Sequence, residues 1–188
     1  MGLVIAAVVA GCGGSGSSGT HASTKTFDAA EAPFTFQYPA TFKLQPHLVG
    51  GASRNRPTYQ TAVGPGGSSY VLVATYPLLL RIRADGSAMT NKGKVVPRAT
   101  LAREMDAAIQ QIGSAAGMRL QGTPAAAALG ALPARVYSYA KADGSLGTTF
   151  IVALIGRQEI FVACQHTPSD RDAVSSACDT LRRTFALR

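Results

Sequence analysis

The chain has 188 residues, of which 46% are apolar and 15% are charged. This balance is typical of a globular protein and excludes a long disordered body. Its 18 Lys and Arg residues against 10 Asp and Glu residues give a formal net charge of +8, so the surface should attract polyanions. No nucleic-acid-binding module is recognisable, and we therefore expect no nucleic acid among the partners.

The first residues predict export and lipid attachment. Residues 3–10 form an apolar run that is too short to span a bilayer as a helix. The segment Val9-Ala10-Gly11-Cys12 resembles a bacterial lipobox, whose cysteine receives a diacylglycerol. We therefore expect residues 1–12 to be a lipoprotein signal peptide, with Cys12 as the lipid attachment site.

Residues 13–30 begin with a Gly/Ser-rich stretch and are predicted to be a flexible tether. The protein is then expected at the cell membrane, anchored by lipid on the extracytoplasmic face. No Lys or Arg precedes the apolar run, so either the true start lies upstream or the signal is atypically short. The alternative is a buried N-terminal strand that carries an ordinary cysteine.

Residues 31–188 have the length of one domain. The first predicted strand covers residues 34–38, where aromatic side chains alternate onto one face. Strands at 59–63 and 70–76 are predicted to form a hairpin through a Gly-Pro-Gly-Gly turn. The polar, basic stretch 81–97 is expected to be a long loop.

A helix is predicted from Thr100, as its N-cap, to about residue 116. Its expected apolar face consists of Leu101, Met105, Ile109 and Ile112. Three strands are predicted next, at 134–140, 148–155 and 159–164. The middle strand has an unbroken apolar run and should be covered on both faces.

Ser169 is expected to cap a last helix, whose apolar face would consist of Val174, Cys178, Leu181 and Phe185. The order of strands, helix, three-strand meander and helix predicts an α+β domain. In such a domain helices cover an antiparallel sheet.

Cys164 and Cys178 form the second candidate site. Cys164 shares a strand face with Ile160 and Val162, and Cys178 lies on the apolar face of the helix that should pack there. In an oxidising compartment this placement predicts a structural disulfide. Two buried free thiols are the alternative.

Catalytic and metal-binding patterns are missing from the sequence. It contains no Gly-x-Ser-x-Gly elbow, His-Glu-x-x-His helix, phosphate-binding glycine loop or dinucleotide fingerprint. Cys164 and His166 would share a strand face, but no third ligand stands near them, so we expect no metal site. Glu104 and Asp106 should point to different faces of their helix. We expect no cofactor and no catalytic residues.

The basic middle of the chain supplies a candidate anion-binding loop. Five cations cluster there around glycines: Arg81, Arg83, Lys92, Lys94 and Arg98. Loops on a rigid sheet often carry binding residues, so this one could contact anionic lipid headgroups, an acidic envelope protein or a glycan. The alternative is an ordinary solvated surface.

The two ends of the domain resemble a known family. Residues 34–42, Phe-Thr-Phe-Gln-Tyr-Pro-Ala-Thr-Phe, resemble the start of PsbP-like domains, and residues 177–187 resemble their final helix and terminal Phe-containing segment. The lipobox and the cysteine pair are similar to those of LpqN-type envelope lipoproteins. The resemblance implies a three-layer α/β/α sandwich with a mostly antiparallel central sheet.

The resemblance also implies a non-enzymatic role, because these domains assist assemblies or bind partners, and it supplies no catalytic residues. We therefore predict a membrane-anchored binding or accessory module of the cell envelope. An envelope hydrolase with an unrecognised active site is the alternative. A polarised Ser, His and Asp cluster in a cleft would favour the hydrolase, and an apolar groove without one would favour binding.

Overall fold

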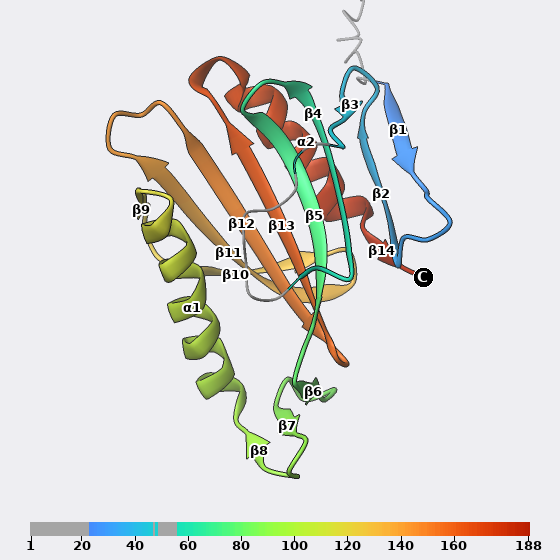
Figure 1. Cartoon of the computed structure of the whole chain (residues 1–188), viewed down its shortest axis with the longest axis vertical. Coiled ribbons are helices and arrows are strands. Elements are labelled where there is room, and N and C mark those ends of the chain that lie inside the picture. The colour runs from blue at the N-terminus through green and yellow to red at the C-terminus, as the bar shows by residue number, and fades with distance from the viewer. Residues whose placement is uncertain (1–22, 47, 49–55) are drawn as a thin grey trace, which may run out of the picture.

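The computed structural model describes residues 23–46, 48 and 56–188. An antiparallel sheet of eight strands runs through the middle of the molecule (Figure 1). In spatial order, seven of its strands are β10 (Ala125–Leu129), β11 (Leu132–Lys141), β12 (Gly147–Ile155), β13 (Gln158–His166), β5 (Ser69–Pro77), β4 (Tyr59–Gly66) and β3 (Lys43–Leu44). The eighth, β9 (Met118–Leu120), pairs with the C-terminal half of β11, whereas β10 pairs with its N-terminal half.

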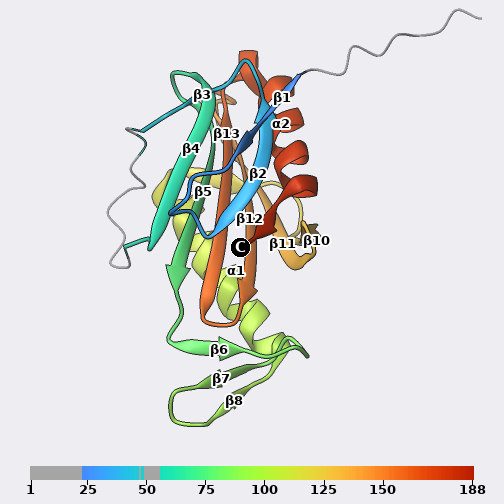
Figure 2. The ribbon, with the colours of Figure 1, turned by 90° about the vertical axis from the view of Figure 1, so that its right-hand side faces the viewer.

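Further layers cover both faces of this sheet (Figure 2). On one face lie α2 (Arg171–Thr184), which follows a 3₁₀ turn at Pro168–Asp170, and a small antiparallel sheet. The strands of that small sheet are β1 (Thr24–Phe27), β2 (Phe34–Pro39) and β14 (Ala186–Leu187). The other face carries α1 (Arg98–Ala115). The predicted α+β, three-layer sandwich is confirmed.

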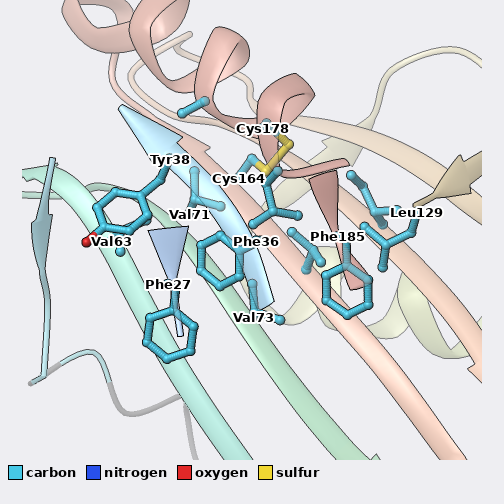
Figure 3. Close-up of a cluster of buried hydrophobic side chains, with 14 of the residues drawn as sticks. Phe27, Phe36, Tyr38, Val63, Val71, Val73, Leu129, Cys164, Cys178 and Phe185 are labelled. Atoms are coloured by element: carbon cyan, nitrogen blue, oxygen red, sulfur yellow. A yellow bond between two sulfur atoms is a disulfide. The ribbon is translucent and has the colours of Figure 1, made fainter. Parts of the chain in front are cut away.

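Strand β12 shows why three layers form. Ile151 and Val152 are neighbours in sequence, yet each is only 1% exposed. Side chains alternate along a strand, so Ile151 packs into the cluster under α2 and Val152 into the cluster under α1. Figure 3 shows part of the cluster under α2, where aromatic rings from β1 and β2 meet the valines of the sheet. This strand is covered on both faces, as predicted.

Helix α2 has the apolar face that its sequence predicts. Val174, Cys178 and Leu181 are buried within it, and Phe185 is buried directly after the helix ends at Thr184. The helix itself begins at Arg171, because Ser169 lies in the preceding 3₁₀ turn and does not cap it.

Helix α1 differs more from its prediction. It begins at Arg98, directly after Pro97, and Thr100 does not cap it. Among its four predicted apolar positions only Ile109 is fully buried, whereas Ile112 is 45% exposed. The helix lies near the edge of the sheet, where less surface is available to cover its apolar face.

The predicted long loop at 81–97 is wrong. It contains two of the three short strands β6 (Leu80–Ile82), β7 (Ala88–Thr90) and β8 (Val95–Val96), which form a small antiparallel sheet that we call the β6–β8 arm. Gly86 and Gly93 have positive φ angles in its two turns. Strands of two or three residues are too short to show a period-two pattern among so many cations.

Three further strands also differ from the prediction. Strand β1 begins at Thr24, inside the predicted tether 13–30, because it pairs with β2 and buries Phe27. Strands β9 and β10 were not predicted at all. The sequence of β10 is Ala-Ala-Ala-Ala-Leu, and alanine is depleted in strands, so pairing with β11 overrides a weak local preference.

Candidate functional site

A groove with a volume of about 400 Å³ lies between α1, the β6–β8 arm and one end of the main sheet. Five elements supply its walls: the β6–β7 turn, the first half of α1, β10, β11 and β12. The apolar lining consists of Ile82, Leu101, Ala102, Met105, Leu132, Val152, Leu154 and Ile155, among others. The charged lining consists of Arg83, Asp85, Arg98 and Arg135.

The groove exists because only the second half of α1 packs closely on the sheet. Ile109 and Gly113 are the buried residues of this helix. A Cβ at Gly113 would overlap the ring of Tyr139, so this glycine lets the helix approach β11 closely. In the first half, Leu101 and Met105 are only half-buried and line the groove.

An ion pair joins the middle of α1 to the floor of the groove. The Arg135 Nε and Nη2 atoms each donate to an Asp106 carboxylate oxygen at 2.9 Å. The Tyr137 hydroxyl donates to the same carboxylate at 2.7 Å. Burial, and then the hydrogen bond to Asp106, raise the pKa of Tyr137 well above its ordinary range. The hydroxyl therefore stays protonated and acts as a donor.

Two other arginines stand at the mouth of the groove. Among the described residues, neither the Arg83 nor the Arg98 side chain makes an ion pair or a hydrogen bond within the groove. Asp85 also lies at the mouth, but its carboxylate accepts from the Ser87 N–H at 2.9 Å and from its hydroxyl at 2.6 Å. The Arg98 stem packs against Gly86, where a Cβ would lie 3.1 Å from Cδ.

The five predicted anion-binding residues are therefore divided by the fold. Arg83 and Arg98 line the groove together, although they are fifteen positions apart in sequence. Arg81, Lys92 and Lys94 do not line it and are exposed on the β6–β8 arm. Arg81 lies opposite Met89, which lies opposite Val95, so these three residues form one exposed row across the arm.

Cys164 on β13 and Cys178 on α2 form a disulfide, with their Cα atoms 6.0 Å apart (Figure 3). Both residues are buried in the core under α2, so the bridge is structural. It also removes Cys164 as a metal ligand beside His166. In the described part of the chain, no cluster of His, Cys, Asp and Glu could hold a metal ion. The predicted lipid site, Cys12, lies outside the described residues, as do His21 and His47.

One cluster brings Ser, His and Asp side chains near one another. The Ser69 hydroxyl donates to Asp170 at 2.6 Å, and Thr167 donates to the same oxygen at 2.9 Å. These two donors lower the pKa of Asp170. Ser69 is 1% exposed, and His166 contacts the Thr167 carbonyl oxygen rather than the serine. A nucleophilic serine needs a base and an open face, so this cluster fastens the β4–β5 turn to the start of α2.

The sequence prediction missed most residues of the groove. Asp106 and Arg135 are 29 positions apart, and no spacing rule links them. From the sequence, Asp106 stands out only as a neighbour of Glu104, which is exposed on α1. The alternation of Arg135, Tyr137 and Tyr139 on one face of a strand was the one available signal, because an arginine on an aromatic face usually has a carboxylate partner.

No helix of the described residues is long and apolar enough to cross a membrane.

No protein-family model matches the chain, and no curated protein matches it. Among solved structures, the solution structure of cyanobacterial PsbP (CyanoP) from Synechocystis sp. PCC 6803 is similar, with a TM-score of 0.55 and 16% sequence identity. The match covers 96% of this chain and 99% of that chain. The crystal structure of LpqN from Mycobacterium tuberculosis, a protein involved in cell envelope biogenesis, has a TM-score of 0.48 and 12% identity over 87% of this chain and 91% of that chain.

The similarity to CyanoP shows that this chain has a PsbP-like fold, as the resemblance of its two ends implied. At this identity it shows the fold alone, and the function has to be argued from the groove.

Proposed function

We propose that this PsbP-like domain is a lipid-anchored, extracytoplasmic module of the cell envelope that binds its ligand in the groove between α1 and the main sheet, without catalysis. The observation that carries the proposal is the groove itself. Its volume of about 400 Å³ lies within the range of small-molecule sites, and its walls are apolar with a few convergent charged groups.

The anchoring part of the proposal has two supports. The first is the lipobox-like segment that ends at Cys12. The second is the Cys164–Cys178 disulfide, because such bonds persist outside the cytoplasm and are rare within it. The described fold begins with β1 at Thr24, so residues 13–23 would connect the lipid to the domain.

The non-enzymatic part rests on the chemistry of the groove. The one carboxylate that lines it, Asp85, accepts from Ser87. Asp106, which pairs with the lining residue Arg135, also accepts from Tyr137. A hydrolase would need a nucleophile or an activated water beside a base. The Ser69, His166 and Asp170 cluster does not line the groove, so no specific observation favours the hydrolase.

The proposal is tested by blocking the groove in the membrane-anchored protein. Ala102 lines the groove from α1, so Ala102→Trp should fill it. Ala107 is exposed on the same helix, and Ala107→Trp is the matched control. Each protein is released from membranes in mild detergent, and native mass spectrometry records which molecules remain bound.

We expect wild type and Ala107→Trp to retain an envelope molecule that Ala102→Trp loses. Retention by all three proteins would place binding elsewhere and overturn the groove as the site. Circular dichroism and urea unfolding of both variants show whether each is folded, so that loss of ligand is not mistaken for loss of fold.

A further inference from the structure

We infer that the groove takes an amphiphile with one acyl chain and an anionic headgroup, carboxylate or phosphate. The inference rests on the proposed function, since it names the class of ligand for the same groove. The apolar walls and the charges at the mouth are independent observations, and each restricts the chemistry of the ligand.

The walls favour a hydrocarbon chain. Leu101 and Met105 on α1 face Val152 and Leu154 on β12 across the groove. Leu101, Met105 and Leu154 are partly exposed. Covering such surface with hydrocarbon is favourable because it removes apolar area from water. A polar ligand such as a free sugar would leave these side chains without suitable partners.

The size of the groove favours one chain. A volume of about 400 Å³ is near the lower end of the range for ligand sites, which is roughly 300–1,000 Å³. A single medium-length chain fits this space, whereas the two chains of a phospholipid would exceed it.

The charges at the mouth favour an anion. Three arginines, Arg83, Arg98 and Arg135, line the groove together with one aspartate, Asp85. Arg135 pairs with the Asp106 carboxylate. Asp85 accepts two hydrogen bonds from Ser87 but keeps its negative charge, which also attracts Arg83. Arg83 on the β6–β7 turn and Arg98 at the start of α1 therefore leave one net positive charge at the mouth. Guanidinium groups bind carboxylate and phosphate oxygens through paired N–H donors.

The test measures binding of four single-chain probes of equal chain length: dodecanoate, dodecyl phosphate, dodecyl maltoside and dodecyltrimethylammonium. The protein is the full chain with Cys12→Ser, purified in oxidising buffer, and calorimetry is run below the micelle concentration of each probe. We expect both anionic probes to bind at least about tenfold more tightly than the neutral and cationic probes, as one or two charge-assisted hydrogen bonds allow. The ratio between dodecanoate and dodecyl phosphate then shows which headgroup is preferred.

Variants separate the headgroup contacts from the chain contacts. The double variant Arg83→Gln/Arg98→Gln should weaken the anionic probes about tenfold and change dodecyl maltoside less than about twofold. The control is Arg119→Gln, at an exposed arginine on β9 outside the groove. It should change neither the affinity for the anionic probes nor the affinity for dodecyl maltoside. Ala102→Trp should abolish binding of every probe.

The outcomes distinguish failure of the inference from failure of the proposed function. Equal binding of anionic and neutral probes, lost in Ala102→Trp, would keep the groove as the site and overturn the anionic class. Tighter binding of the cationic probe, also lost in Ala102→Trp, would likewise keep the groove as the site and overturn the anionic class. Binding that Ala102→Trp leaves unchanged, or no binding of any probe, would contradict the inference and also count against the groove as a binding site.

Discussion

Glu159 is a carboxyl placed where its charge is costly. It lies on β13 between Tyr76 of β5 and Leu154 of β12, on the face of the sheet that also carries α1. Among the described residues its side chain has no ion pair. Burial raises its pKa above the ordinary value of 4.5, and its charge in turn helps to raise the pKa of Tyr76, after burial.

A raised carboxyl pKa in the folded state makes the protein lose stability as the pH rises. The unfolded chain releases this proton near pH 4.5, whereas the folded chain holds it to higher pH. Glu159→Gln should therefore be more stable than wild type at pH 7, and the difference should shrink to nothing below the ordinary pKa. Urea unfolding between pH 3.5 and 7.5 measures this.

The control for this prediction is Glu104→Gln, at an exposed carboxyl on α1. If the difference in free energy of unfolding between wild type and Glu159→Gln does not change with pH, the prediction is wrong. Glu159 would then be well solvated or paired.

At the scale of elements, α1 depends on a close approach at one glycine. A Cβ at Gly113 would overlap the Tyr139 ring. Alanine favours helix over glycine by about 1 kcal/mol, but overpacking costs about 1–3 kcal/mol. Gly113→Ala should therefore lower the free energy of unfolding by about 1 kcal/mol in urea titration. Ser114→Ala, at the exposed next position, should not destabilise, and an equal or greater stability of Gly113→Ala would contradict the packing described here.

The disulfide joins β13 to α2 and closes a loop with a sequence separation of 14. A loop of this length contributes about 3 kcal/mol in the chain-entropy model. The double variant Cys164→Ala/Cys178→Ala should lose about that much stability in urea. Intact mass after alkylation, with and without reductant, checks the bond directly, and two alkylated thiols in unreduced exported protein would disprove it.

The elements show what periodicity can and cannot predict. The strands of the meander and the apolar face of α2 could be predicted from the sequence. Their apolar patterns run over several residues, and the apolar side chains of these patterns are mostly buried in the fold. Strand β10 and the β6–β8 arm could not be predicted in this way. Strand β10 consists almost entirely of alanine, and the strands of the arm have only two or three residues each, so neither sequence carries a periodic signal. Ile112 has helical spacing but is exposed, since spacing does not tell how far a sheet extends beneath a helix.

The groove was predicted only in part for a related reason. The cluster of cations at 81–98 was visible in the sequence, and Arg83 and Arg98 do line the groove. The apolar half of the site comes from α1 and β12, which approach each other only in the folded chain. The ion pair between Arg135 on β11 and Asp106 on α1 likewise forms only when the helix packs on the sheet. A single sequence does not show that these two residues pair.

At the scale of the whole molecule, the β6–β8 arm and the start of β1 lie far apart. In both views the β6–β8 arm is at one end of the long axis and the start of β1 is at the other (Figures 1 and 2). Arg81, Lys92 and Lys94, which are exposed on the arm, therefore lie at the end of the domain opposite to the start of β1.

The anchor itself makes a separate prediction. Cys12→Ala removes the lipid attachment site, and a free N-terminal apolar run of this length holds a protein in a bilayer weakly. The variant should move from the membrane pellet to the soluble fraction, or remain uncleaved, in fractionation with a high-salt wash. Full retention of a processed variant in the washed membranes would show that Cys12 is not the anchor.

The most direct test of the groove as a binding site is photocrosslinking in the intact cell envelope. A benzophenone amino acid replaces Met105, which lines the groove, or Ala107, which is exposed on the same helix. After illumination, mass spectrometry of the purified protein identifies covalent adducts. We predict an amphiphile adduct at position 105 and none at position 107. Equal labelling at both positions, or no adduct at 105 in a folded and anchored protein, would contradict the account.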